Sequence, residues 1–182
     1  GDKNVINIVI GIIILIGYLK MKKLTLTILT CLIFLSPNMV MSETMDDLVK
    51  RDGLWYKKFS EVPFNGKITG ITKGALKNGK KDGAWVSYYS NGQLYSKGNW
   101  KNGKQVGLWI NYYDTGQLWS KGNWKNGKQV GLWINYWDSG QFWFKGNYKN
   151  GKKDGAWVGY WPDGRVIKGY TGTFKNGKKI ID

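Results

Sequence analysis

Tryptophan and lysine recur at fixed intervals in this sequence, and both side chains are suited to binding. Trp85, Trp109, Trp133 and Trp157 are 24 residues apart, and lysines flank the Asn-Gly pairs between them. Aromatic rings pack against apolar or cationic groups, and a row of lysines attracts anions. Residues of these types, repeated at one spacing, favour a binding surface.

The aromatic residues supply one set of candidate binding residues. They are Trp85, Tyr89, Trp109, Tyr113, Trp119, Trp133, Trp137, Trp143, Trp157 and Trp161. A surface this aromatic predicts a platform for a protein partner or for a second copy of the chain, because aromatic rings are enriched at interfaces. Choline-binding repeats also use aromatic cages, but they are shorter and have no Asn-Gly-Lys turn.

The lysines beside the Asn-Gly pairs supply a second set. They are Lys77, Lys80, Lys101, Lys104, Lys125, Lys128, Lys149 and Lys152, in a chain with a formal net charge of +16. Such a strip could hold an anionic membrane surface. The alternative is that lysines around hairpin turns keep the strands soluble. No nucleic-acid partner is expected, because residues 21–42 resemble a signal peptide, as argued below, and export would take the chain away from nucleic acid.

Catalytic chemistry is not indicated. The chain has no histidine and a single cysteine, Cys31. Cys31 lies in the predicted signal peptide, so the chain after that peptide has no imidazole, no thiol and none of the usual zinc ligands. Paired carboxylates can cleave glycosides, but Asp114, Asp138 and Asp163 stand in turns, where turn chemistry explains them. We predict no enzymatic activity, no metal and no cofactor.

The turn residues predict strands joined into hairpins. Aromatic and β-branched segments alternate with glycine-containing turn signals. Asn126-Gly127 fits a two-residue type I′ turn, and Asp114-Thr115-Gly116 fits a three-residue loop. Each 24-residue unit then contains two strands. The sequence predicts an all-β fold, an up-and-down meander of about ten antiparallel strands in an open sheet.

The register of these strands predicts which side chains share a face. If Tyr113 faces Gln117, Asn111 faces Trp119 and Trp109 faces Lys121. The face expected to be the core then contains Leu108, Ile110, Tyr112, Leu118 and Ser120, and the solvent-exposed face contains Trp109, Asn111, Tyr113, Gln117, Trp119 and Lys121.

Two further expectations follow from this register. An extra residue in each unit predicts a β-bulge at Gly107, Gly131 and Gly155. Three lysines are expected to lie over the tryptophan rings that face them, and these are Lys97, Lys121 and Lys145 over Trp85, Trp109 and Trp133.

The ends of the chain differ from the repeats. Residues 1–20 are expected to be an upstream translated segment or fragment, and Met21 the working start. Lys22 and Lys23 followed by the apolar run Leu24–Leu35 predict a signal peptide over 21–42. We therefore expect export to the periplasm, the outer envelope or the medium. Residues 43–77 and 162–182 are expected to be capping repeats that flank the regular units at 78–161, with a turn at Asn65-Gly66.

The repeat unit resembles a known family. The pattern G-x-W-x-x-Y-Y-x-x-G-Q-L-x-x-K-G-x-W-K-N-G-K, which covers roughly 53–178, is similar to the MORN-type repeat, in the variant of YwqK-like proteins that are often labelled antitoxins. The resemblance implies stacked β-hairpins and a non-catalytic role in protein or membrane association. The functional hypothesis is an exported binding or scaffold module, and the alternative is an antitoxin or immunity-like protein that sequesters a toxin.

Overall fold

The computed structural model describes residues 15–21 and 42–181. These residues belong to two units, with 15–21 in the first and 42–181 in the second. In the first unit, residues 15–21 are helical. The described residues contain no helix that is both long enough and apolar enough to cross a bilayer. Most of the predicted upstream segment and signal peptide lies outside the described residues.

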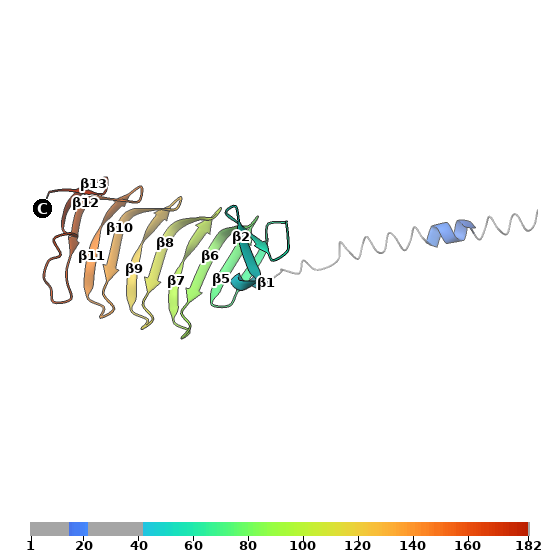
Figure 1. The fold of residues 1–182 in the computed structure, drawn as a ribbon, viewed down its shortest axis with the longest axis horizontal. Helices are drawn as coiled ribbons and strands as arrows, with labels where there is room; N and C mark the ends of the chain where they lie inside the picture. Colours follow the sequence, from blue (N-terminus) through green and yellow to red (C-terminus); the bar gives the residue numbers. More distant parts are fainter. Residues whose placement is uncertain (1–14, 22–41, 182) are drawn as a thin grey trace, which may run out of the picture. The chain divides into compact units, whose positions relative to one another are not determined.

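The second unit is an open sheet of twelve strands in the order β1-β4-β5-β6-β7-β8-β9-β10-β11-β12-β13-β14 (Figure 1). The strands are β1 (Ser42–Thr44), β4 (Gly66–Thr69), β5 (Thr72–Lys77), β6 (Lys80–Tyr88), β7 (Leu94–Lys101), β8 (Lys104–Tyr112), β9 (Leu118–Lys125), β10 (Lys128–Tyr136), β11 (Phe142–Lys149), β12 (Lys152–Gly159), β13 (Gly172–Lys175) and β14 (Lys178–Ile181). Neighbours from β4 onward are antiparallel. The predicted meander is confirmed, with β1 added in parallel to β4.

The Asn-Gly pairs between regular strands form the predicted turns. Asn126 has φ 53° and Gly127 has φ 77°, so both central residues are left-handed, as a type I′ turn requires. Gly116 is also left-handed at φ 87°, and the Tyr113 amide donates to the Gln117 carbonyl across 2.8 Å. The pair at Asn65-Gly66 was predicted as a turn, and this is wrong, because Gly66 begins β4.

Bulges occur at the predicted glycines and also at a second place. Gly107 has φ 66° and Gly131 has φ 64°, and the register shifts beside both. A second shift lies near the other end of the strands, where Tyr112 pairs with Leu118 but Asn111 pairs with Ser120. Trp119 is therefore an extra, bulged residue. The predicted pairing of Asn111 with Trp119 is wrong by one residue.

The predicted core face is also wrong. Trp109 is only 7% exposed and Trp133 only 4%, whereas Leu108 is 51% exposed and Leu132 is 49% exposed. We call the face with Trp109 and Trp133 the tryptophan face, and the face with Leu108 and Leu132 the aliphatic face. The physical reason is size, because an indole ring can remove far more area from water than a leucine side chain when a flat surface is available beside it.

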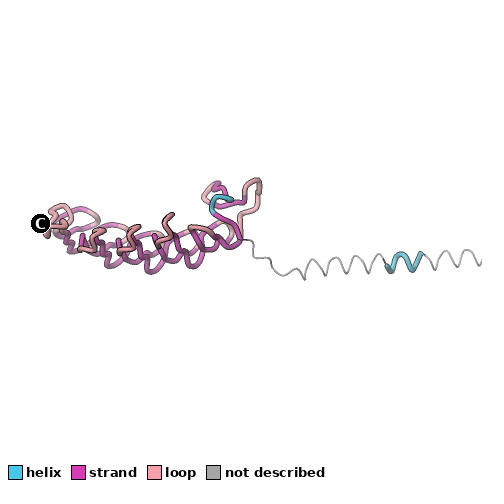
Figure 2. Tube along the Cα trace, turned by 90° about the horizontal axis from the view of Figure 1, so that it is seen from below, coloured by secondary structure: helices cyan, strands magenta, loops and turns pink. Residues whose placement is uncertain are grey.

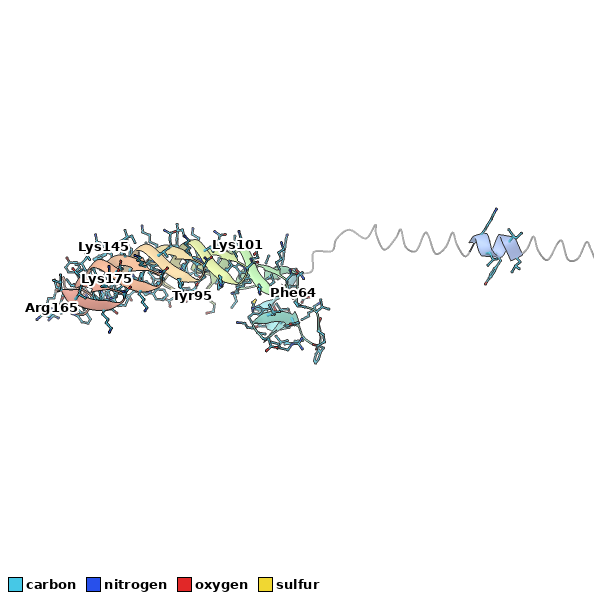
Figure 3. All side chains as sticks on the ribbon, turned by 90° about the horizontal axis from the view of Figure 1, so that it is seen from above. Phe64, Tyr95, Lys101, Lys145, Arg165 and Lys175 are labelled. Carbon is cyan, nitrogen blue, oxygen red and sulfur yellow. The ribbon has the colours of Figure 1, made fainter. Side chains whose placement is uncertain are left out.

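An N-terminal cap covers one end of the tryptophan face. The cap contains the 3-10 turn η1 (Met45–Asp47) and the two-stranded hairpin of β2 (Leu48–Arg51) and β3 (Leu54–Lys57). Figures 2 and 3 show this hairpin folded over one side of the single-layered sheet. Five buried residues form the core between the cap and the sheet, namely Leu48, Phe64, Ile68, Leu76 and Trp85.

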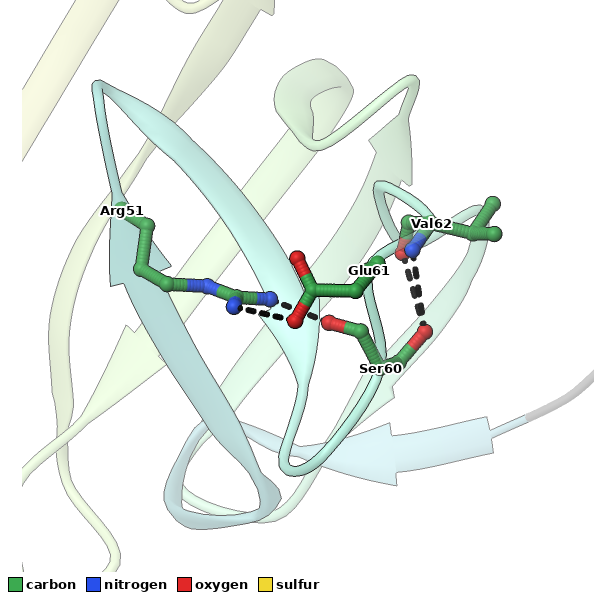
Figure 4. Close-up of polar contacts among 4 residues, drawn as sticks. All are labelled: Arg51, Ser60, Glu61 and Val62. Carbon is green, nitrogen blue, oxygen red and sulfur yellow. Dashed lines mark hydrogen bonds and ion pairs between the residues drawn. The ribbon is translucent and has the colours of Figure 1, made fainter.

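Polar contacts fix the loop that follows the cap hairpin. The Arg51 Nη1 atom lies 2.9 Å from Glu61 Oε1, and its other terminal nitrogen donates to the Ser60 carbonyl (Figure 4). The Ser60 hydroxyl accepts from the Val62 amide at 3.1 Å. The ring of Tyr56 packs on the Arg51 guanidinium, 4.2 Å from ring centroid to charge. These bonds hold residues 60–62 against the hairpin.

The C-terminal end is closed by a different device. The chain leaves β12, forms an irregular excursion over 160–171, and returns as the β13–β14 hairpin. Tyr170, near the end of this excursion, stacks on Phe144 with ring centroids 4.7 Å apart and an interplanar angle of 11°. Phe174 is buried at 6% exposure beside Trp157. Aromatic packing therefore covers the last strands of the sheet.

Candidate binding groove

An open groove of about 490 Å³ crosses the middle of the tryptophan face, from β6 to β11. It runs across the strands, so each strand contributes only a few side chains. Because the hairpin units repeat, equivalent side chains recur every second strand. The groove is built from three kinds of row, which are polar residues, buried tryptophans over glycines, and partly exposed aromatic residues.

A row of hydroxyl and amide side chains forms the polar part of the groove. Strand register aligns Ser87 with Ser96, Ser96 with Asn111, Asn111 with Ser120, and Ser120 with Asn135. The Asn111 Nδ2 atom donates to the Ser120 Oγ atom at 2.8 Å. In the described part of the chain, the Asn135 side chain makes no hydrogen bond. The row therefore has hydrogen-bonding groups to spare.

Beside the polar row, each buried tryptophan lies flat on a glycine of the preceding strand. A methyl group added at Gly98 would overlap the Trp109 ring, and one added at Gly122 would overlap the Trp133 ring. The indole nitrogen of Trp109 donates to the Asn99 carbonyl at 3.2 Å, and that of Trp133 donates to the Asn123 carbonyl at 3.2 Å. Glycine is required here for close packing, and the rings form the base of the groove.

Partly exposed aromatic residues form the wall toward the Asn-Gly turns. Trp100 meets Trp109 edge-on, with centroids 5.7 Å apart and an interplanar angle of 87°. Trp124 meets Trp133 in the same way at 5.6 Å and 87°. Each of these outer rings pairs across the strands with a glutamine, Trp100 with Gln105 and Trp124 with Gln129. One repeat unit therefore supplies one wall ring and one amide.

The opposite wall is formed by residues of the second set of bulges, which the sequence did not predict. Tyr95 and Trp119 line the groove, and each contacts a ring from the loop before it. Tyr95 lies 5.0 Å from Tyr89, and Trp119 lies 5.9 Å from Tyr113, between centroids. Because of the bulge, Trp119 and its neighbour Ser120 both line the groove, whereas a regular strand would point consecutive residues to opposite faces.

Three of the predicted binding residues join successive repeats. The Tyr89 hydroxyl donates to the Tyr112 carbonyl at 2.9 Å, and the Tyr113 hydroxyl donates to the Tyr136 carbonyl at 2.8 Å. Trp137 does the same through its indole nitrogen, 3.0 Å from the Tyr160 carbonyl. Burial, followed by the nearby Asp138 carboxylate, raises the pKa of Tyr113. These side chains act as latches between neighbouring units.

A lysine stands near each end of the groove. Lys81 Nζ lies 4.2 Å from the Trp85 ring centroid and 5.0 Å from that of Trp100. Burial, followed by repulsion from Lys50, lowers the pKa of Lys81. At the other end, Lys153 Nζ lies 4.5 Å from the Trp157 centroid and 4.3 Å from that of Tyr170. Burial lowers the pKa of Lys153.

These contacts correct the predicted lysine–tryptophan pairs. Lys97 was expected over Trp85, but it pairs with Val86, the next residue along β6, on the opposite face. The same displacement applies to Lys121, which pairs with Ile110, and Lys145 Nζ lies over Phe142 at 5.7 Å. The one-residue error in register is the reason. Lys81 and Lys153 make the cation–π contacts instead.

The lysines beside the turns lie along one edge of the sheet. Lys77, Lys101, Lys125 and Lys149 each pair with the lysine that follows their Asn-Gly turn. All eight predicted edge lysines are exposed. A shallow hollow of about 360 Å³ lies among Lys104, Lys125 and Lys128 on this edge.

The groove contains only part of the predicted aromatic set. Trp85, Trp109, Trp119 and Trp133 line it. Trp143 and Trp161 instead stack with Trp137, at 4.3 Å and 6.2 Å between centroids, and Trp157 packs against the C-terminal end. The residues that sequence reasoning missed are Lys81, Ser87, Tyr95, Ser96, Trp100, Gln105, Ser120, Trp124, Gln129, Phe144 and Tyr148. Their 24-residue recurrence was visible in the sequence, but their face was not.

Within the described residues, no group of histidine, cysteine, aspartate or glutamate side chains is arranged to hold a metal ion. The groove-lining residues include no carboxylate. The site therefore offers stacking and hydrogen bonding and two flanking positive charges. It does not bring together the unlike acid, base and nucleophile that catalysis uses.

Comparison with known families agrees with this geometry. The model of the MORN repeat variant matches residues 81–102, 105–126 and 129–150, which are the three units that carry the groove. No curated protein matches the chain. The chain thus carries consecutive repeats of the MORN variant, and such repeats are generally non-catalytic binding units.

Proposed function

We propose that this array of MORN-variant repeats is a non-catalytic binding module of the bacterial envelope that holds a protein partner on its tryptophan face. The observation that supports the proposal most directly is the open groove of about 490 Å³ across β6 to β11. A single-layer sheet cannot bury both faces by itself, and a partner would cover the one that displays aromatic rings.

The composition of the groove suits a protein ligand. Aromatic anchors surrounded by polar groups are typical of the energetically important centre of an interface. Trp119 supplies an anchor from a bulge, and Asn111 and Asn135 supply amides beside it. The two caps cover the tryptophan face at either end of the sheet and leave this central part open.

The lysine edge supports a second contact, with an anionic surface. The eight exposed lysines recur along one edge of the sheet at two-strand intervals, roughly 9–10 Å. A basic strip gains about 1 kcal/mol per lysine near an anionic bilayer, and the gain falls as salt is added. Binding of the full chain to vesicles with anionic lipids should therefore weaken steeply with ionic strength, and salt-independent binding would contradict this part of the proposal.

Partner binding is tested by capture from an envelope extract with the full chain and two matched variants. Trp119→Ser removes a ring that lines the groove, whereas Leu132→Ser removes a half-exposed side chain from the aliphatic face. We expect the first variant to lose the partner and the second to retain it. Equal capture by both variants would place the binding surface elsewhere, and capture of a cytoplasmic toxin would favour the antitoxin alternative.

Export is tested separately. A mature protein that begins near Glu43 would support cleavage of the predicted signal peptide after Ser42. N-terminal sequencing of the protein recovered from the envelope fraction provides the measurement. Recovery of the uncleaved chain from the cytoplasm alone would overturn the envelope location.

A further inference from the structure

We propose that the groove takes a proline-rich peptide in the polyproline II conformation, lying across the strands. The inference rests on the proposed function, and it specifies the class of protein partner. Three features of the structure support it, which are the spacing of the repeated amides, the free hydrogen-bonding groups, and the length and charge of the groove.

The amide side chains repeat at a distance that matches the polyproline II helix. Gln105 and Gln129 are equivalent residues two strands apart, and so are Asn111 and Asn135. Two strand spacings are about 9.4–9.8 Å. A polyproline II helix has three residues per turn and rises about 3.1 Å per residue, or about 9.3 Å per turn. Every third residue of such a ligand therefore meets the same chemistry in the next repeat.

Other backbone conformations fit this spacing less well. A β-strand shows the same side about every 6.6 Å, so its contacts fall out of step within one repeat. An α-helix returns to the same side after seven residues, about 10.5 Å. That step exceeds the repeat by about 1 Å, and the error grows with each unit. The polyproline II helix stays within about 0.5 Å per repeat.

The hydrogen-bonding groups of the groove complement a chain of carbonyls. A polyproline II backbone has no internal hydrogen bonds, so all of its carbonyl oxygens need donors, and proline has no amide hydrogen of its own. In the described part of the chain, the side chains of Gln105, Gln129 and Asn135 make no hydrogen bond. Their amide hydrogens are therefore available to carbonyl groups of a ligand. Trp119 and Trp124 provide the aromatic surfaces against which proline rings pack.

The length and charge of the groove define the ligand further. From β6 to β11 there are five strand spacings, about 24 Å, which accommodates about eight residues at polyproline II rise. Lys81 stands at the β6 end, and Lys153 lies on β12, just beyond the other end. The groove-lining residues carry no carboxylate. The ligand that fits is a run of about eight proline-rich residues with an acidic residue at each end.

The test is calorimetric titration of the full chain with capped oligoprolines of increasing length, each with a terminal aspartate at both ends. Affinity should rise with length and level off near about eight residues. Peptides with glycine in place of proline should bind at least tenfold more weakly, because they are not preformed in this conformation. A flat length dependence, or equal binding of the glycine peptides, would overturn the proposal.

Two variants connect the binding to the groove. Gln105→Ala combined with Gln129→Ala removes two side chains that make no hydrogen bonds within the described chain, so the fold should persist, and we expect about tenfold weaker binding of the oligoproline. Leu132→Ser on the aliphatic face should bind as the unchanged chain does. Thermal melting of each variant establishes that the sheet is intact. Unchanged affinity in a folded double variant would contradict the assigned site.

Two other ligand classes serve as competitors in the same assay. Chitin or cellulose oligosaccharides and an amphipathic helical peptide are also ligands that a groove of aromatic rings and amides can hold, and binding of either in place of oligoproline would overturn the inference. If partner capture depends on Trp119 but no oligoproline binds, the ligand class is wrong and the proposed function stands. If capture does not depend on Trp119 and no oligoproline binds, the proposed function and the proposed ligand class are both wrong.

Discussion

Single side chains hold neighbouring repeats together in this molecule, and the Tyr113 hydroxyl is a clear case. It donates to the Tyr136 carbonyl in the next unit at 2.8 Å. Tyr89 makes the same bond one repeat earlier, and Trp137 makes it one repeat later with an indole nitrogen. The equivalent position in three successive repeats thus donates the same hydrogen bond although the residue type changes. The predicted role of these residues in binding a partner stays a prediction, whereas their role as latches is visible.

Removing this hydroxyl should destabilise the sheet measurably. Tyr113→Phe leaves the ring in place and deletes a hydrogen bond worth about 1 kcal/mol. The melting temperature should fall by about 2–4 °C for a chain of this size. Tyr112→Phe is the matched control, since within the described residues the Tyr112 hydroxyl makes no hydrogen bond. Equal melting temperatures for the two variants would show that the latch does not contribute.

The partly buried Lys81 gives a second prediction at this scale, which concerns pH. Burial and Lys50 lower the pKa of Lys81, so between that lowered value and the ordinary one the unfolded chain carries a proton that the folded chain has lost. Stability contributed through Lys81 therefore rises with pH in that window. Gln105 and Gln129 stand at the positions equivalent to Lys81 in the next two repeats. Lys81→Gln therefore introduces a residue that the repeat accommodates, and it removes the titrating amine.

The measurement is chemical unfolding of both proteins at several pH values. The stability of the unchanged chain relative to Lys81→Gln should increase as the pH is raised toward the ordinary lysine pKa of about 10.4. Tyr113 and Tyr148, whose pKa values are raised by burial, act in the opposite direction, but they are common to both proteins and cancel in the difference. A difference that is constant or falls with pH would mean that Lys81 keeps its charge at no cost.

At the scale of strands and turns, the sequence predicts connections better than faces. Asn-Gly pairs favour a left-handed backbone at both positions, so the type I′ turns could be predicted from residue type alone. The bulge at Gly131 could be predicted in the same way, because glycine tolerates the bulge geometry. The bulge at Trp119 could not, because tryptophan carries no conformational signal of that kind. Since alternate residues of a strand point to opposite faces, this undetected bulge misplaced Ser120 and Lys121, and the equivalent bulge at Tyr95 misplaced Lys97.

The glycine row beside the tryptophans provides a test of the observed faces. An alanine at Gly122 would overlap the Trp133 ring, and overpacking of a core costs about 1–3 kcal/mol. Gly169→Ala is the control, because nothing lies within 4 Å of the added group. We expect a clearly lower melting temperature for the first variant only. Equal melting curves would mean that Trp133 does not pack on Gly122. They would support the original prediction that this ring is exposed to solvent.

At the scale of the whole sheet, the fold is an array whose units contact only their neighbours. Each regular hairpin contributes one tryptophan on a glycine, one wall ring and one latch, so the stability of the array is close to a sum over units and their interfaces. The meander and its 24-residue repeat could be predicted from the sequence because every regular unit has the same pattern of turn and aromatic residues. The sequence places capping segments at 43–77 and 162–182 but does not predict how they pack, since Leu48, Phe64 and Tyr170 stand outside the regular repeat and their contacts with the tryptophan face depend on tertiary packing.

This additivity predicts the outcome of removing a repeat. Deletion of residues 105–128 joins Lys104 to Gln129, and because Gln129 is equivalent to Gln105, the junction reproduces the original sequence. The shorter chain should fold into a sheet with two fewer strands and retain its β-sheet circular dichroism. It should melt at a lower temperature, because one set of unit and interface contacts is lost. Both caps should still close the ends, since neither contacts the deleted residues through its principal rings.

The same deletion should shorten the groove by two strand spacings, about 9.4–9.8 Å. That length corresponds to about three residues of polyproline II, so the peptide length at which affinity levels off should fall from about eight residues to about five. A matched deletion of residues 81–104 removes Lys81 as well, and its plateau should fall by the same amount with weaker binding of the acidic end. If the shortened sheet folds and the plateau length is unchanged, the ligand does not lie across the strands.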